Sequence, residues 1–351
     1  MFKGIRRFGI SAVLVLTFLL LAVSCASTKE KAFEVPAELA EYEQYSWNWQ
    51  VPKDGKLHFF FMATEGLKMS NPDSGGEKWG DCCLIILPDG QTILIDTGFQ
   101  DFAPLMTLNL KKMGISKIDY FILSHAHSDH AGATFLGDFL IFDRFEIGKI
   151  IYGATFNSAW SDPELIENRA KLYKIPVETY KAGDSFEIGG VHFDVYNPQE
   201  DMVRVIASAT PDVNNASFVF KMTYGTFTAL FTGDLYAAQE AKLVELYGDR
   251  LDADLLKIPH HGHNTSSTRI WADAVTPKIA VATGNVAIEQ MQYVNYTING
   301  SKVLFDRIDG YIHVWSDGTG EPGYETSRQR PASFYDKLEA GTPAIEKLKG
   351  N

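Results

Sequence analysis

The stretch Ser124–Ala131 reads SHAHSDHA and places three histidines and one aspartate within six positions. An apolar run that ends at Leu123 precedes it, which predicts a buried strand whose end delivers these polar side chains. Imidazole nitrogens and carboxylate oxygens are the ligands that zinc and similar divalent ions prefer. A solvated polar loop is the alternative, but so many coordinating groups directly after a buried strand favour a metal site. The coordinating residues are His125, His127, Asp129 and His130.

Hairpins and helices surround this stretch in the sequence. CCLIILPDGQTILIDTG predicts a hairpin that turns at Pro88–Gly90, and FAPLMTLNLKKMG predicts a helix. Further hairpins are predicted in DSFEIGGVHFDVYNP and ASFVFKMTYGTFTALFTGD, followed by a helix over about 237–247. Strands are then predicted in ADLLKIPH, IAVAT, KVLFDR and YIHVWSDG, with a helix near 267–273. The pattern predicts an α+β architecture of two mixed β-sheets packed face to face, with helices outside.

The N-terminus has the pattern of a targeting signal. Basic residues in MFKGIRRFG precede the apolar run ISAVLVLTFLLLAV, and Ser24 and Cys25 follow. This order is typical of a secretory signal, and the cysteine after AVS resembles the bacterial lipobox, in which it is lipidated. A plain membrane anchor or an ordinary signal peptide is the alternative. We therefore expect an exported bacterial lipoprotein, held at the cell membrane or outer membrane through Cys25.

Composition sets the domain organisation and limits the partners. The chain has 351 residues, of which 45% are hydrophobic, enough for one large domain or two small ones. We expect a signal peptide over 1–24, a tether over 25–56, a catalytic domain over 57–318 and a C-terminal tail over 319–351. The formal net charge of −12 disfavours tight, non-specific binding of nucleic acid. The adjacent Cys82 and Cys83 are expected to be small buried side chains without a disulfide.

SHAHSDHAG resembles the signature of the metallo-β-lactamase superfamily, and three further motifs resemble that family in the expected order. TILIDTG would supply Asp96 to support the site, LFTGD would supply the metal-bridging Asp234, and LKIPHHG would supply the last ligand, His260. The likeness runs from about Leu57 to Gly318. It implies an αββα sandwich with one or two metals at the edge of the sheets.

A closer resemblance is to the ComEC-like C-terminal metallo-β-lactamase domain, which is implicated in cutting nucleic acid. NNASFVF, ADLLKIPHHGHNTSS and DGYIHVWSDG carry it. Asn214 and Asn215 stand where other family members have a histidine ligand, so the first metal site is incomplete in residue type. The resemblance implies a first site of His125, His127 and Asp234, helped by an asparagine carbonyl. It implies a second site of Asp129, His130, Asp234 and His260.

The expected chemistry is hydrolysis by a metal-activated water. Asp129 would orient the nucleophile, and His261 would donate to a developing oxyanion or serve only as a structural histidine. Thr265 and Ser266 would contact substrate or cap a helix, together with the adjacent Ser267. Asn214 and Asn215 are further candidates for substrate contact.

The sequence thus predicts an exported metal-dependent hydrolase with zinc as the first choice of metal and manganese as the second. A phosphodiester is the favoured substrate, as a nucleotide, a nucleic acid or an envelope phosphoester. Hydrolysis of a β-lactam or another ester or amide, and a non-catalytic, metal-stabilised binding lipoprotein, are the alternatives. Outside the metal motifs, we expect the aromatic cluster YSWNWQ (45–50) to pack on the domain rather than bind substrate, and His58 and His313 to be structural. The sequence does not fix the oligomeric state.

Overall fold

The structure is a computed structural model. It describes residues 33–63, 80–135, 137–154, 156–157, 163–202, 206–207 and 209–349. The predicted signal peptide and Cys25 lie outside this part of the chain. Val35–Asn351 forms one compact unit. Among the described residues, no helix combines the length and apolar character needed to cross a membrane.

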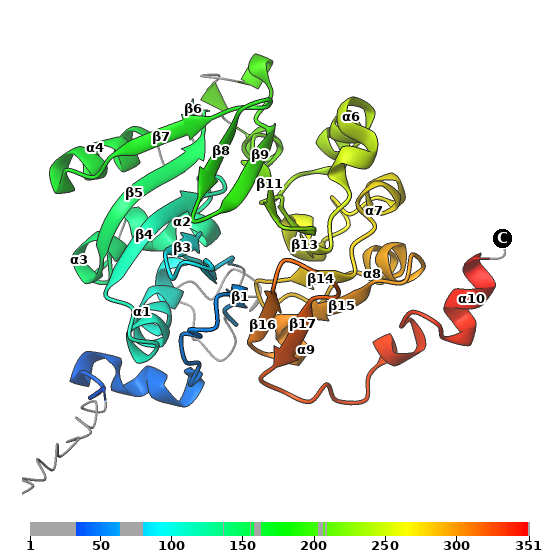
Figure 1. Cartoon of the computed structure of the whole chain (residues 1–351), viewed down its shortest axis with the longest axis horizontal. Helices are drawn as coiled ribbons and strands as arrows, with labels where there is room; N and C mark the ends of the chain where they lie inside the picture. The colour runs from blue at the N-terminus through cyan, green and yellow to red at the C-terminus, as the bar shows by residue number, and fades with distance from the viewer. Residues whose placement is uncertain are drawn as a thin grey trace, which may run out of the picture. The chain divides into compact units, whose positions relative to one another are not determined.

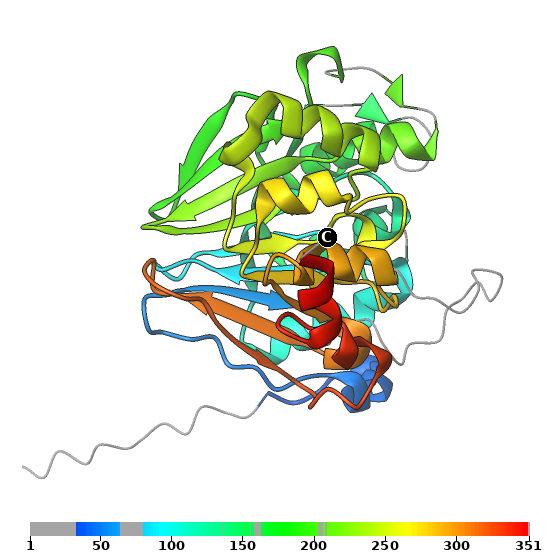
Figure 2. The same cartoon turned by 90° about the vertical axis from the view of Figure 1, so that its right-hand side faces the viewer.

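Two mixed β-sheets build the unit (Figures 1 and 2). Each sheet combines antiparallel hairpins with a parallel group, β3–β4–β5–β7 in the first sheet and β12–β13–β14–β15 in the second. The eight-stranded sheet has the order β17 (Gly323–Thr326), β16 (Ile312–Ser316), β1 (Leu57–Phe61), β2 (Cys83–Ile86), β3 (Thr92–Ile95), β4 (Lys117–Leu123), β5 (Glu146–Gly153) and β7 (Val177–Tyr180). The seven-stranded sheet has the order β15 (Lys302–Phe305), β14 (Ile279–Ala282), β13 (Leu255–Lys257), β12 (Phe227–Phe231), β11 (Val219–Tyr224), β9 (Val191–Asn197) and β8 (Ser185–Ile188). A short parallel pair joins β6 (Phe156–Asn157) and β10 (Ile206–Ala207).

Helices cover the outer faces of the two sheets, with α1 and α3 beside β4 and β5, and α6, α7 and α8 on the other side of the molecule (Figure 1). The α-helices are α1 (Ala103–Lys112), α2 (Ser128–Phe135), α3 (Ile141–Arg144), α4 (Pro163–Tyr173), α5 (Thr210–Asn215), α6 (Ala237–Tyr247), α7 (Arg269–Val275), α8 (Gln290–Thr297), α9 (Asp306–Asp309) and α10 (Pro343–Lys349). The 3₁₀ segments are η1 (Ala37–Tyr45), η3 (Gln100–Phe102), η4 (Glu200–Met202), η5 (Gly248–Leu251), η6 (Pro259–Gly262) and η7 (Phe334–Lys337).

The core is divided into three apolar layers because strand side chains alternate between faces. In β1, Phe59 and Phe61 enter the layer between the sheets, where Phe231 of the second sheet meets them. Phe60 points the other way, into the layer beneath α1. The third layer lies beneath α6, α7 and α8 and includes Trp271. These layers give the predicted α+β sandwich, and the predicted hairpins β2–β3, β8–β9 and β11–β12 are confirmed. Cys82 and Cys83 are buried free thiols, as predicted.

The compact unit extends beyond the expected boundaries 57 and 318 in both directions. On the N-terminal side, η1 lies beside α1, the backbone N–H of Trp47 donates to Asn109 Oδ1 at 3.0 Å, and Trp49 is buried. On the C-terminal side, β17 pairs with β16, and Arg330 forms ion pairs with Asp309 and Glu339. Aromatic and charged side chains in these segments fold onto the sandwich, although their polar composition suggested a tether and a tail.

Candidate metal centre

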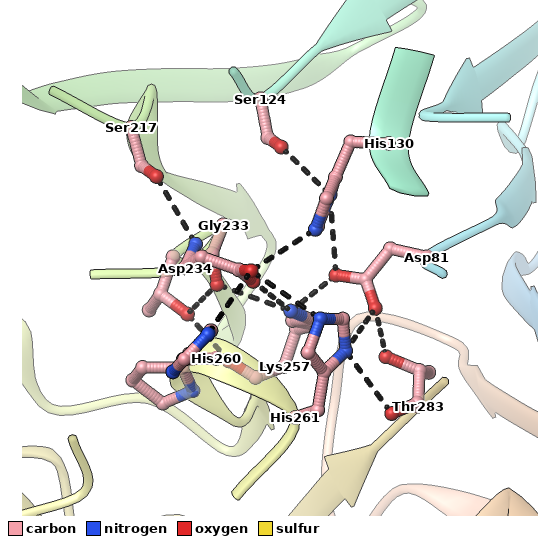
Figure 3. A network of polar contacts seen from close by, with 12 residues as sticks. Asp81, Ser124, His130, Ser217, Gly233, Asp234, Lys257, His260, His261 and Thr283 are labelled. Carbon is pink, nitrogen blue, oxygen red and sulfur yellow. Dashed lines mark hydrogen bonds and ion pairs between the residues drawn. The ribbon is translucent and has the colours of Figure 1, made fainter. Parts of the chain in front are cut away.

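The polar cluster lies where several strands of both sheets end. Asp96 follows β3, Asp234 follows β12, and Lys257 is the last residue of β13. Ser124 and Thr283 directly follow β4 and β14. Carboxyl ends of parallel strands meet at one edge of a sheet, which is where ligands bind in open α/β sheets. Packing the two sheets face to face brings these two edges together (Figure 3).

Asp96 fixes the orientation of His130. Its Oδ2 lies 2.7 Å from His130 Nδ1 and accepts from Ser124 Oγ at 2.6 Å, while its Oδ1 accepts from the Ser124 backbone N–H at 2.7 Å. A carboxylate at Nδ1 keeps the ring proton on that nitrogen, so the lone pair of Nε2 points into the site. Asp96 thus lies behind His130, where the sequence predicts it to support the site.

Imidazoles converge on one oxygen of Asp234. Its Oδ2 lies 3.2 Å from His130 Nε2 and 3.3 Å from His261 Nε2, and 3.9 Å from both His125 Nε2 and His260 Nε2. The side chains of His130 and Asp234 are 0% and 2% exposed. The cluster therefore gathers nitrogen and oxygen donor atoms around one buried point, as a metal site requires.

Four residues have one ligand atom each within 4.8 Å of one another: Asp129, His130, Asp234 and His261. This set of two carboxylates and two imidazoles suits a divalent metal. Three of its members are among the ligands expected for the second site. The fourth place, expected for His260, is taken by the adjacent His261.

The two adjacent histidines occupy different positions in the site. Both have left-handed backbone conformations, with φ of 46° at His260 and 57° at His261, and this kink turns His261 into the interior. His260 lies at the rim with its side chain 12% exposed, and its Nδ1 hydrogen-bonds to Thr265 Oγ1. Burial lowers the pKa of His260 to about 4. Sequence spacing could not distinguish the two rings, because consecutive left-handed residues are rare outside glycine.

Two site residues were missed by sequence reasoning, Asp81 and Lys257. The Lys257 ammonium is buried and forms an ion pair with Asp81 Oδ2, donates to the Gly233 carbonyl at 3.0 Å and lies 3.5 Å from Asp234 Oδ1. Asp81 Oδ1 accepts from the Thr283 hydroxyl and lies 3.2 Å from His261 Nδ1. Asp81 thus lies beside Nδ1 of His261, as Asp96 lies beside Nδ1 of His130.

The charges of this network are strongly coupled. Burial alone would raise the pKa of Asp81 and of Asp234, but the nearby cations lower both values. Burial alone would lower the pKa of His130, but Asp234, Asp81 and Asp129 raise it well above its ordinary value. The site therefore favours positive charge at its centre, which is the electrostatic condition for holding a divalent metal.

The first metal site expected from the sequence forms a neighbouring group. His125 Nε2 lies 3.1 Å from His127 Nδ1, and the side chain of His127 contacts that of Asn214. Asn214 is 1% exposed, and its amide also contacts the Tyr236 side chain. Asn215 instead accepts from the Tyr236 N–H through Oδ1 at 3.3 Å. Asn214 is thus the better placed of the two asparagines to complete this group.

The loop after His261 is held by a buried glutamate. Glu240 of α6 accepts from the backbone N–H groups of Ser267 and Thr268 and from the Thr268 hydroxyl. Thr268, rather than Thr265–Ser267, caps α7 by accepting from the Trp271 N–H at 3.3 Å, which corrects the expected cap. The Ser266 hydroxyl donates to the carbonyl of Pro259 at 3.0 Å and is therefore engaged within the loop.

Comparison with known families agrees with this architecture. The model of the family described as the metallo-β-lactamase superfamily matches residues 80–282, which is more than half of the chain. The chain therefore belongs to the metallo-β-lactamase superfamily and has the metallo-hydrolase fold. Members of this superfamily usually bind one or two divalent metals, and the His/Asp cluster lies within the matched region.

Curated relatives include competence proteins. The chain is 29% identical to competence protein ComA of Neisseria gonorrhoeae over 72% of its own length and 33% of that protein. It is 27% identical to ComE operon protein 3 of Bacillus subtilis over 49% of its length and 20% of that protein. The chain thus spans about a third or less of these relatives. Among solved structures, the metallo-β-lactamase fold protein YhfI from Bacillus subtilis is 15% identical, with a TM-score of 0.44, over 71% of this chain and 96% of that one.

Proposed function

We propose that this protein is a metal-dependent phosphodiesterase that acts outside the cytoplasm while tethered through Cys25. The observation that supports it most is the buried group of Asp129, His130, Asp234 and His261, whose ligand atoms lie within 4.8 Å of one another. Zinc is the metal we propose first, since two imidazoles and two carboxylates suit it, and manganese second. A divalent ion held by these residues would lower the pKa of a bound water and polarise a phosphoryl oxygen.

The residues of the chain have distinct parts in this proposal. Asp96 and Asp81 orient His130 and His261 from behind, so that the Nε2 atoms of both rings face the centre. Asp129 is 14% exposed, against 0% for His130, and it orients the attacking water by accepting a hydrogen bond from it. The water oxygen forms the new P–O bond while the P–O bond to the alcohol breaks, and the proton that the water loses passes to the leaving oxygen.

His260 has a role at the rim in this proposal. His260 Nδ1 hydrogen-bonds to Thr265 Oγ1. In this proposal the Thr265 hydroxyl is the donor, so Nε2 carries the ring proton and donates to a phosphoryl oxygen. In this proposal, His260 donates the hydrogen bond to the substrate, and His261 is the metal ligand. This arrangement suits an anionic, tetrahedral phosphate centre, in which charge develops on several oxygens at once.

Phosphodiesters are favoured over β-lactams because Asn214 stands in place of a histidine ligand of the first site. The resemblance to the ComEC-like domain, together with the relative named competence protein ComA, supports nucleic acid or nucleotides as substrate. The net charge of −12 disfavours long polyanions and favours short or envelope-linked phosphoesters. We place small phosphodiesters first and nucleic acid second.

A panel of substrates tests this proposal. Purified protein starting at residue 26 is loaded with zinc or manganese and offered bis-p-nitrophenyl phosphate, dinucleotides, single-stranded DNA and a chromogenic β-lactam. Cleavage of the phosphodiesters, at least tenfold faster than of the β-lactam relative to each uncatalysed rate, is expected. Hydrolysis of the β-lactam alone, or of none of these compounds by the metal-loaded protein, contradicts it.

A further inference from the structure

A cavity of about 500 Å³ lies on the outer side of the first sheet, away from the metal centre. None of the residues that line it belongs to the metal centre. They come from the segment before β1 and from β1, β16 and β17: Trp47, Asn48, Trp49, Gln50, Pro52, Phe60, His313, Glu325 and Thr326. The aromatic cluster of the sequence analysis thus both packs on the domain and forms a wall of this cavity.

The aromatic rings of the cavity are set at steep angles to one another. Trp47 stacks on Tyr311 with an interplanar angle of 18°, whereas Trp49 stands edge-on to the same ring at 87°. The two indole planes are therefore steeply inclined to each other. Phe60 and His313 are nearly parallel, at 10°, and Trp49 is tilted from them by 59° and 64°. Inclined rings form a cage around a rounded group, whereas a flat ligand is held best between parallel rings.

One carboxylate completes the lining. Glu325 Oε1 lies 2.9 Å from His313 Nδ1, and the Glu325 side chain is 59% exposed, so the imidazole positions the carboxylate while leaving it open to solvent. His313 is held in turn by His58, whose Nδ1 lies 3.0 Å from His313 Nε2, and His58 Nε2 lies 2.8 Å from Asp54 Oδ1. Burial lowers the pKa of His313. The predicted structural histidines thus form a hydrogen-bonded chain that fixes the cavity wall.

The cavity selects for positive charge. No lysine or arginine is found among its lining residues, all of which are described. Trp47 is 38% exposed, an unusual exposure for a large ring that could otherwise pack against the core. Ring faces attract cations, and an adjacent carboxylate adds to that attraction. An anionic ligand would be repelled by Glu325.

We propose that this cavity binds an organic cation, a substituted ammonium group with an apolar surface, between the indoles of Trp47 and Trp49 and beside Glu325. This site is independent of the metal centre and of the proposed hydrolysis. Its amide groups, on Asn48 and Gln50, can hydrogen-bond to whatever the ammonium group is attached to.

Calorimetric titration of metal-free protein with tetramethylammonium chloride tests the proposal. Saturable binding is expected, with an affinity at least fivefold higher than that of neopentyl alcohol, which has a similar shape but no charge. Trp47→Ala and Glu325→Gln should each weaken binding by about threefold to fivefold, consistent with partly exposed cation–π and charge contacts. Trp47→Phe retains a ring and should retain most of the affinity.

Glu321→Gln is the matched control, because Glu321 lies between the strands β16 and β17 with its side chain 78% exposed and pairs with Lys278 instead of the cavity. This variant should bind tetramethylammonium like the wild type.

Vesicle binding distinguishes the two sources of the cation. Retention of the protein on phosphatidylcholine vesicles but not on phosphatidylglycerol vesicles would assign the cation to a lipid headgroup. Equal retention of the protein on both kinds of vesicle would assign it to a soluble ligand. The proposal is overturned if tetramethylammonium does not bind saturably, or if neopentyl alcohol binds equally well. It is also overturned if methyl glucoside displaces bound tetramethylammonium, or if the affinity is unchanged in both Trp47→Ala and Glu325→Gln. None of these binding measurements depends on catalysis. They can therefore fail while the phosphodiesterase assay succeeds, and succeed while it fails.

Discussion

Asp96→Asn is the substitution that tests the geometry of the metal centre most sharply. The amide keeps the shape of the carboxylate but offers only one acceptor oxygen. In the wild-type protein, the two oxygens of Asp96 accept from three donors at 2.6–2.7 Å: Ser124 N, Ser124 Oγ and His130 Nδ1. In one amide orientation, the NH₂ group faces His130 Nδ1 and drives the ring proton to Nε2, where a metal should bind. In the other, the NH₂ group faces the backbone N–H of Ser124, which then loses its acceptor.

Either outcome has a measurable free-energy cost. A buried donor without an acceptor costs about 1–3 kcal/mol. Substituting a residue that orients a metal-binding histidine typically lowers metal affinity by about 10- to 100-fold, equivalent to about 1.4–2.7 kcal/mol. We therefore expect zinc affinity to fall by at least tenfold in Asp96→Asn, with a native fold.

Competition with a chromogenic chelator measures this change, and circular dichroism verifies the fold. Asp119→Asn is the control, since Asp119 accepts from the Thr92 backbone N–H at 3.0 Å in the same sheet but at the opposite end of β3. The control should retain wild-type zinc affinity. Wild-type affinity in Asp96→Asn, or an equal loss in both variants, would refute the argument that Asp96 sets the tautomer of His130.

Three further outcomes follow from the same contacts. Lys257→Met leaves the buried Asp81 carboxylate without its ammonium partner, so urea unfolding of the metal-free variant should show a loss of about 3–5 kcal/mol; a loss below about 1 kcal/mol contradicts this. His261→Ala should weaken zinc binding by at least tenfold more than His260→Ala, as measured by chelator competition, and the reverse order would restore the expectation from the sequence. Burial raises the pKa of Glu240 from 4.5 to about 7, so the folded state binds more protons than the unfolded state in that window. Stability should therefore fall as pH rises from 4.5 to 7, by up to about 3 kcal/mol from this group, and Glu240→Gln should flatten that slope in urea titrations at several pH values.

Much of the fold was predictable because local patterns and tertiary structure agree. The turn at Pro88–Gly90 and the alternation on either side of it predicted the hairpin β2–β3, and the structure has that hairpin. The motif SHAHSDHA after a buried strand placed Asp129 and His130 together at a sheet edge, and both lie in the ligand group of the structure. In these cases, the residues that matter are neighbours in the sequence.

The features that the sequence did not predict depend on contacts between distant segments. Asp81 and Lys257 are far apart in the sequence, and only the packing of the two sheets makes them an ion pair. The different positions of His260 and His261 depend on two left-handed backbone conformations that no residue pattern signals. The polar composition of the segment before β1 predicts a tether, yet Trp49 of this segment is buried in the core layer beneath α1.

The dependence of phosphodiester cleavage on metal and on Asp234 is the most direct test of the account. Chelated protein should not cleave bis-p-nitrophenyl phosphate, and stoichiometric zinc or manganese should restore cleavage. Asp234→Asn removes the charge on which the imidazoles converge, so the same metal additions should leave the variant at least 100-fold less active. Undiminished cleavage by chelated wild-type protein, or by metal-loaded Asp234→Asn, would contradict the assignment of this cluster as the catalytic metal centre.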